Sequence, residues 1–164
     1  VLYTPLKRRT PLCTLVGAVP GAMPPLIGWA AATGRLDLEG WVLFGLLFLW
    51  QLPHFLSIAW LYREDYAAAG FRMLPVTDPS GWRTARQLVL YTAALVPTSL
   101  LPTLIGLSGP AYFYGALAAG IGFAALAGTA AVIHSQQSAR RVFIGSISYL
   151  PLLLAMLVID RGVQ

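Results

Sequence analysis

Four stretches of this sequence are long, apolar and free of charged residues, and they restrict the possible folds more than any other feature. They cover residues 10–34, 41–60, 87–133 and 142–159. An α-helix needs about 20 mostly apolar residues to cross the hydrocarbon core of a bilayer. The third stretch is long enough for two crossings, and the Gly and Pro within 107–112 are typical of a turn between them. The sequence therefore predicts five transmembrane helices.

The expected fold class is an all-α, polytopic transmembrane helix bundle. Charged residues make up 10% of the 164 residues, against about 25% in a soluble domain. Several prolines fall inside the predicted helices, which membrane helices tolerate because neighbouring groups satisfy the freed carbonyls. We expect the helices near 12–33, 41–61, 86–107, 111–134 and 142–160.

The distribution of basic residues predicts which loops face the cytoplasm. Nine of the 11 Lys and Arg residues fall on the first, third and fifth loops, and only Arg35 and Arg161 fall on the other side. Cytoplasmic loops carry an excess of Lys and Arg. We therefore expect the 62–85 loop to be cytoplasmic. The basic balance reflects this topology and anionic lipid, since the sequence has no nucleic-acid recognition pattern.

Two polar residues interrupt the second predicted helix. Gln51 and His54 are three residues apart, so we expect them on one face. An ionisable residue inside a membrane helix is a candidate functional residue. Asp65 follows His54 by eleven residues, which at ~100° per residue returns it to within about 20° of the same direction, ~16 Å further along the axis. If the helix continues by one turn, a carboxylate at the membrane surface lies above a buried imidazole.

The residues alone leave two interpretations of Asp65. The arrangement suits an amphiphilic substrate with an anionic head, because Mg²⁺ bridges carboxylate and phosphate oxygens and needs few protein ligands. Cations such as Lys7, Arg8, Arg63 or Arg72 would neutralise the remaining charge. In the second interpretation Asp65 pairs with Arg63 or Arg72 and the loop is structural. Counting charges does not decide between the two.

Four segments, taken in order, carry a resemblance to a known family. They are 3-YTPLKRRTPLCTLVGAVPGAMPPLIGWAAATG-34, 50-WQLPHFLSIAW-60, 65-DYAAAGFRMLPV-76 and 140-RRVFIGSISYLPLLL-154. Together they resemble the protohaem IX farnesyltransferase (haem O synthase) family, a branch of the UbiA-type membrane prenyltransferases. The similarity runs over nearly the whole chain. Each motif alone would be a weak signal, but the ordered set is highly specific.

The resemblance implies a nine-helix bundle in the bacterial inner membrane, of which residues 1–164 form the C-terminal part of one domain. It implies transfer of a farnesyl group from farnesyl diphosphate to a vinyl group of haem B, with Mg²⁺ as cofactor, to give haem O. That product serves haem-copper terminal oxidases, so haem A synthase and oxidase assembly factors are candidate partners. The active-site loops would be cytoplasmic.

The resemblance also implies roles for individual residues. Asp65 would bind the metal and the diphosphate, and Lys7 and Arg8 match a basic pair that faces the diphosphate. His54 and Gln51 match positions that line the interior, where the porphyrin or the isoprenoid lies. The remaining candidates for substrate binding are Tyr66, Arg63 and Arg72, the last of which replaces a Pro found in many members.

One part of the expected site precedes this sequence. A first loop, Asn-x-x-x-Asp-x-x-x-Asp, is expected upstream of Val1, so we expect no activity from these 164 residues alone. One alternative function is another UbiA-type prenyltransferase that acts on a quinone precursor or chlorophyllide. The other is a membrane transport or assembly protein without catalysis, which the near absence of charge from the last three helices disfavours.

Overall fold

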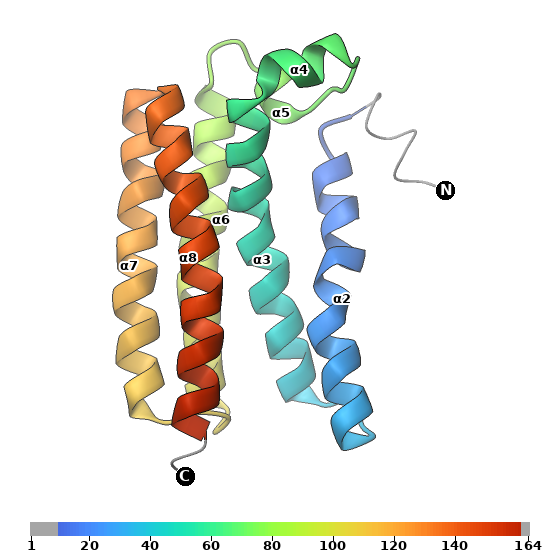
Figure 1. The fold of residues 1–164 in the computed structure, drawn as a ribbon, viewed down its shortest axis with the longest axis vertical. Coiled ribbons are helices and arrows are strands. Elements are labelled where there is room, and N and C mark those ends of the chain that lie inside the picture. The colour runs from blue at the N-terminus through green and yellow to red at the C-terminus, as the bar shows by residue number, and fades with distance from the viewer. Residues whose placement is uncertain (1–9, 162–164) are drawn as a thin grey trace.

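The computed structural model describes residues 10–161 and contains only helices and connections in that range (Figure 1). Five helices are long and two are short. The elements are α2 (Cys13–Thr33), α3 (Leu38–Leu61), α4 (Arg63–Ala68), α5 (Leu74–Thr77), α6 (Trp82–Leu104), α7 (Pro110–Ile133) and α8 (Gln136–Arg161). The five long helices are each long and apolar enough to cross a membrane, which confirms the predicted number.

Three helices begin earlier than predicted: α3 begins at Leu38 instead of near residue 41, and two others have polar first turns. α6 begins at Trp82 instead of near residue 86, and α8 begins at Gln136 instead of near residue 142. The Ser138 backbone N–H donates a hydrogen bond of 3.1 Å to the Ser135 hydroxyl, which caps the start of α8. A charge-free window does not detect a helix that extends into polar sequence, so the prediction placed both starts too late.

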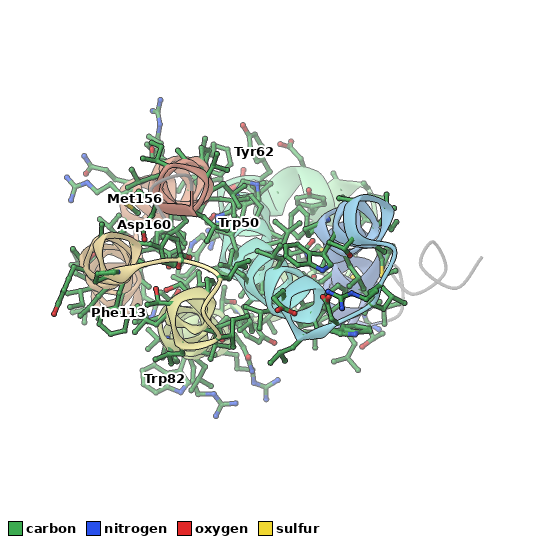
Figure 2. All side chains as sticks on the ribbon, turned by 90° about the horizontal axis from the view of Figure 1, so that it is seen from below. Trp50, Tyr62, Trp82, Phe113, Met156 and Asp160 are labelled. Carbon is green, nitrogen blue, oxygen red and sulfur yellow. The ribbon has the colours of Figure 1, made fainter. Side chains whose placement is uncertain are left out.

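Four of the long helices form the core of the bundle. Within this group, each helix packs against two of the others: α3, α6, α7 and α8. α2 lies outside the group and packs along α3 (Figure 1). The core is filled by large side chains, among them Leu46, Leu95, Tyr112, Phe123 and Tyr149. Seen along the bundle, α8 and α2 lie on either side of α3 (Figure 2). This arrangement leaves α3 with contacts to both.

The predicted alternation of the loops is confirmed. The connections after α3 and α7 lie at the same end of the bundle, where the rings of Trp60 and His134 are 6.0 Å apart (Figure 1). The short loops around Arg35 and Gly109 lie at the opposite end. The basic connections from Arg63 to Arg86 and around Arg140 therefore gather at one end of the molecule.

α3 ends where the sequence predicted and does not continue by the extra turn that would align Asp65 with His54. α3 ends at Leu61, and Tyr62 has φ −109° and ψ 29°, outside helical geometry. α4 starts at Arg63 and turns across the end of the bundle (Figure 1). Asp65 therefore lies on a separate short helix, and the predicted stripe from Gln51 to Asp65 does not form.

Candidate functional site

A short lid covers the end of the bundle between α2 and α3. It consists of α4, the turn at residues 69–73 and α5. Gly70 ends α4 with φ +71°, a left-handed conformation that glycine adopts at little cost. This turn brings Phe71 back toward Tyr66, with a hydrogen bond of 2.9 Å from the Phe71 N–H to the Tyr66 carbonyl. The lid then contacts α2, where the sulfurs of Cys13 and Met73 lie 3.6 Å apart.

A cavity of about 310 Å³ lies beneath this lid, and we call it the α2–α3 pocket. Its lining combines side chains of α2, α3 and the lid, so residues far apart in the sequence meet there. Two of the predicted site residues, Gln51 and Tyr66, both line it. Apolar surface comes from Phe55 and Phe71. The α2–α3 pocket thus has a polar group on an otherwise mostly apolar wall near the basic end of the bundle.

Gln51 is held rigidly in this wall. The residue is 4% exposed, and its Nε2 donates a hydrogen bond of 2.8 Å to the Ala18 carbonyl of α2. A Cβ atom at Gly21 would lie 2.5 Å from the Gln51 Oε1, so a larger residue at position 21 requires the amide to move. Burial of an amide is tolerated when it is hydrogen-bonded. The small residue at position 21 therefore serves the site as well as helix packing.

His54 turns toward α8, in a different direction from Gln51. Its Nδ1 lies 2.8 Å from the Ser146 hydroxyl, and its ring stacks on Trp50 and Phe143 with centroid distances of 4.8 and 5.3 Å. Trp50 also crosses to α8, donating a hydrogen bond of 2.7 Å to the Ser146 carbonyl (Figure 2). The expectation that Gln51 and His54 share one face is therefore wrong.

Asp65 is exposed on α4, as are Arg63 and Glu64, and it is not among the residues that line the α2–α3 pocket. Between residues 10 and 161, the one ion pair joins Arg35 to Asp37 at 3.7 Å, so Asp65 pairs with neither Arg63 nor Arg72. The structural interpretation of this loop, which required such a pair, is not observed.

Asp65 and Glu64 are the carboxylates available on the lid for a metal ion. In the part of the chain that the structure describes, no three His, Cys, Asp or Glu side chains come together. Mg²⁺ is commonly bound by one or two carboxylates together with substrate phosphates. The exposed carboxylate of Asp65 fits such a shared site and does not fit an all-protein metal cage. Lys7 and Arg8 precede the described range, so the structure does not place them.

Sequence reasoning missed a second aspartate of the same connection. Asp78 is 5% exposed and accepts hydrogen bonds from the Thr84 N–H (2.8 Å), the Thr84 hydroxyl (3.0 Å) and the Ser80 hydroxyl (2.9 Å). Burial alone would raise the pKa of Asp78, but these bonds lower it below its usual value. Asp78 therefore anchors the start of α6 behind the lid. The turn sequence Asp-Pro-Ser-Gly was the available signal.

Comparison with known proteins gives a consistent result. Residues 1–157 match the UbiA prenyltransferase family. The chain is 56% identical over 160 residues to a protoheme IX farnesyltransferase of Solibacter usitatus (strain Ellin6076), covering 98% of this chain and 55% of that protein. It is 47% identical over 168 residues to a protoheme IX farnesyltransferase of Koribacter versatilis (strain Ellin345), covering 98% and 54%. A third, from Opitutus terrae, is 52% identical over 162 residues, covering 97% and 54%.

The chain spans about half the length of the curated relatives it matches. No solved structure matches it.

Proposed function

Because this chain belongs to the UbiA prenyltransferase family, we propose that the enzyme containing it transfers the farnesyl group of farnesyl diphosphate to a vinyl group of haem B, giving haem O. The observation that carries this proposal is the similarity, between 42% and 56% identity over nearly the whole chain, to relatives named protoheme IX farnesyltransferase. The five apolar helices make the chain a multi-pass membrane protein.

We place farnesyl diphosphate in the α2–α3 pocket. Its apolar lining suits the isoprenoid, and the lid that closes it carries Asp65 at the end where the basic residues gather. UbiA prenyltransferases generally depend on a divalent metal ion, and we assign this role to Mg²⁺ held by Asp65. When bound, Mg²⁺ neutralises charge on the departing diphosphate. Lys7 and Arg8 would add positive charge beside it.

The reaction needs no nucleophilic side chain. The C–O bond between farnesyl C1 and the diphosphate breaks, and the electron pair leaves with the diphosphate. A vinyl carbon of the porphyrin then forms the new C–C bond, and water adds to the adjacent carbon with loss of a proton. The aromatic rings of Phe55 and Tyr66 line the α2–α3 pocket and would stabilise the allylic cation by cation–π attraction.

Residues on the α8 side of α3 would serve the porphyrin. His54, Trp50 and Phe143 form a stack of flat rings there, and aromatic faces favour offset stacking with other π systems. The alternative of a quinone precursor or chlorophyllide acceptor would use the same fold. The names of the relatives favour the haem acceptor.

We place the lid in the cytoplasm of a bacterial cell, with the helices in its inner membrane. The excess of Lys and Arg at the lid end supports this orientation. Haem A synthase or terminal oxidase assembly factors would receive the product and are therefore proposed partners.

Product analysis tests the proposal. The full-length enzyme in nanodiscs is incubated with farnesyl diphosphate and Mg²⁺ together with haem B, an aromatic acid or chlorophyllide, and the products are identified by mass. Conversion of haem B to haem O supports the proposal. Farnesylation of only the aromatic acid or chlorophyllide would assign another UbiA-type activity, and no product from any acceptor would favour a non-catalytic role.

A further inference from the structure

A second pocket opens at the lid end of the bundle, between the end of α3 and the start of α8. It has a volume of about 510 Å³ and is lined by Leu61, Tyr62, Gln136, Gln137, Arg140 and Phe143. We call it the α3–α8 pocket. In the sequence, residues 134–141 have the composition of an ordinary connecting loop. Their position in the structure gives them a shared surface with α3.

The rim of this pocket is suited to an anion. Arg140 is its one charged lining residue, and no carboxylate lines it. Within residues 10–161, Arg140 forms no ion pair. The amides of Gln136 and Gln137 and the hydroxyl of Tyr62 add neutral donors. An arginine guanidinium binds a carboxylate through two parallel hydrogen bonds, and is the usual residue for this recognition.

One lining residue of this pocket also belongs to the aromatic stack. Phe143 lines the pocket and stacks on His54, with ring centroids 5.3 Å apart, and His54 stacks on Trp50 at 4.8 Å. Trp50 is fixed to α8 by its hydrogen bond to the Ser146 carbonyl. A cationic group in the same pocket as the end of a row of flat rings matches a ligand that is planar and apolar but carries carboxylates along one edge.

We propose that the α3–α8 pocket binds the propionate edge of a porphyrin, with Arg140 paired to a propionate and the macrocycle directed toward the Phe143–His54–Trp50 stack. This inference rests on the proposed function and deepens it, because it assigns the acceptor to one helix pair and its carboxylates to one residue. Figure 2 shows Tyr62 and Trp50 on the α8 side of α3, where this ligand would lie.

The two pockets then place both substrates against one helix. Gln51 and Phe55 face the α2–α3 pocket, and His54 faces α8. The rings of His54 and Phe55 are 5.6 Å apart, so the two sides of α3 are adjacent. The two pockets therefore have neighbouring side chains of α3 in contact between them.

The test measures porphyrin affinity in the full-length enzyme in nanodiscs, by the change in Soret absorbance on titration with protohaem. Arg140→Gln removes the charge, and Arg141→Gln is the matched control, since Arg141 is exposed on the same helix turn but does not line the pocket. We expect about a tenfold weaker affinity for Arg140→Gln, because a charged hydrogen bond contributes about 1.5 kcal/mol or more. Arg141→Gln should bind like the wild type.

Two further titrations identify the ligand group. The first uses protohaem dimethyl ester, whose propionates are blocked, and this ester should bind to Arg140→Gln and to the wild type with equal affinity. The second uses farnesyl diphosphate, whose affinity should be the same for Arg140→Gln and the wild type. The inference would be overturned if Arg140→Gln weakened binding of the ester as much as binding of protohaem. It would also be overturned if Arg140→Gln left the protohaem affinity unchanged or lowered the affinity for farnesyl diphosphate. If the wild type binds no protohaem, the proposed function itself is contradicted. If the wild type binds protohaem and Arg140→Gln binds it equally well, only the assignment of the porphyrin to the α3–α8 pocket is contradicted.

Discussion

The imidazole of His54 and the hydroxyl of Ser146 lie 2.8 Å apart across the interface of α3 and α8. The Ser146 hydroxyl also lies 2.6 Å from the Phe143 carbonyl, to which it donates its proton. It must then accept a hydrogen bond from His54, so Nδ1 carries a proton, and in the neutral ring Nε2 keeps the lone pair. The serine therefore fixes both the orientation and the tautomer of the histidine.

This relationship predicts the effect of Ser146→Ala. The variant removes the acceptor for His54 Nδ1, so the ring loses its fixed tautomer and orientation. We expect the KM for haem B to rise about 5- to 20-fold, equivalent to roughly 1–2 kcal/mol, with little change for farnesyl diphosphate. Ser148→Ala is the matched control, because Ser148 is exposed and bonds only to its own helix at Ile144. Equal effects of the two variants would contradict the prediction.

A second prediction concerns His54 itself. His54→Ala should weaken the use of haem B more than the binding of farnesyl diphosphate, because the ring stacks on the α8 side and does not line the α2–α3 pocket. Steady-state KM values for both substrates measure the difference. A parallel loss for the two substrates would show that His54 serves only the packing of the bundle.

A third prediction concerns the space that Gly21 leaves for Gln51. Gly21→Ala should displace the Gln51 amide, because the new Cβ would meet its Oε1 at 2.5 Å. We expect a loss of about 1–3 kcal/mol in stability, because displacement breaks the buried hydrogen bond of Gln51 to the Ala18 carbonyl, and weaker binding of farnesyl diphosphate. Gly28→Ala is the control, since a Cβ there meets nothing within 4 Å. The measurement is the thermal unfolding temperature in detergent. Equal unfolding temperatures for Gly21→Ala and Gly28→Ala would refute this role of Gly21.

A fourth prediction follows from the lowered pKa of Asp78. A carboxyl group whose pKa is lower in the folded state stabilises the fold above its unfolded pKa of about 3.9, and this contribution is lost as the pH falls through the folded value. Acidification from pH 5 to pH 3 should therefore lower the unfolding temperature of the wild type more than that of Asp78→Asn. At pH 7 the variant should be less stable by about 1–2 kcal/mol. Glu64→Gln, which changes an exposed carboxylate of the lid, should follow the wild type across this pH range.

The transmembrane architecture could be predicted from the sequence, because a bilayer imposes a length and an apolar composition on each helix. The alternation of the loops could be predicted for the same reason. The starts of α6 and α8 could not, since both helices extend into polar residues that a hydropathy window excludes. Local hydrogen bonds accompany those starts, from the Ser138 N–H to the Ser135 hydroxyl in α8 and from the Thr84 N–H to the Asp78 carboxylate in α6.

The details of the site depended on tertiary structure. Gln51 and His54 are three residues apart, which separates them by about 60° around a helix, and α3 packs against α2 on one side and α8 on the other. The small angle therefore sends the two side chains to different neighbours. Asp65 does not lie above His54 on one helix, because α3 ends at Leu61 and Tyr62 is not helical. Residues 62 and 140 both line the α3–α8 pocket although they are far apart in the sequence. A local sequence pattern cannot predict that they lie close together in the structure.

The most direct test of the account is Mg²⁺-dependent farnesyl transfer by the full-length enzyme carrying Asp65→Asn, compared with Glu64→Gln. Both residues are exposed on α4, so both variants should insert into the membrane normally. We expect Asp65→Asn to reduce haem O formation at least 100-fold, because the loss of a metal-binding charge removes several kcal/mol of stabilisation from the transition state, and Glu64→Gln to keep most of the activity. Turnover of Asp65→Asn near the wild-type rate, with an unchanged Mg²⁺ dependence, would contradict the account.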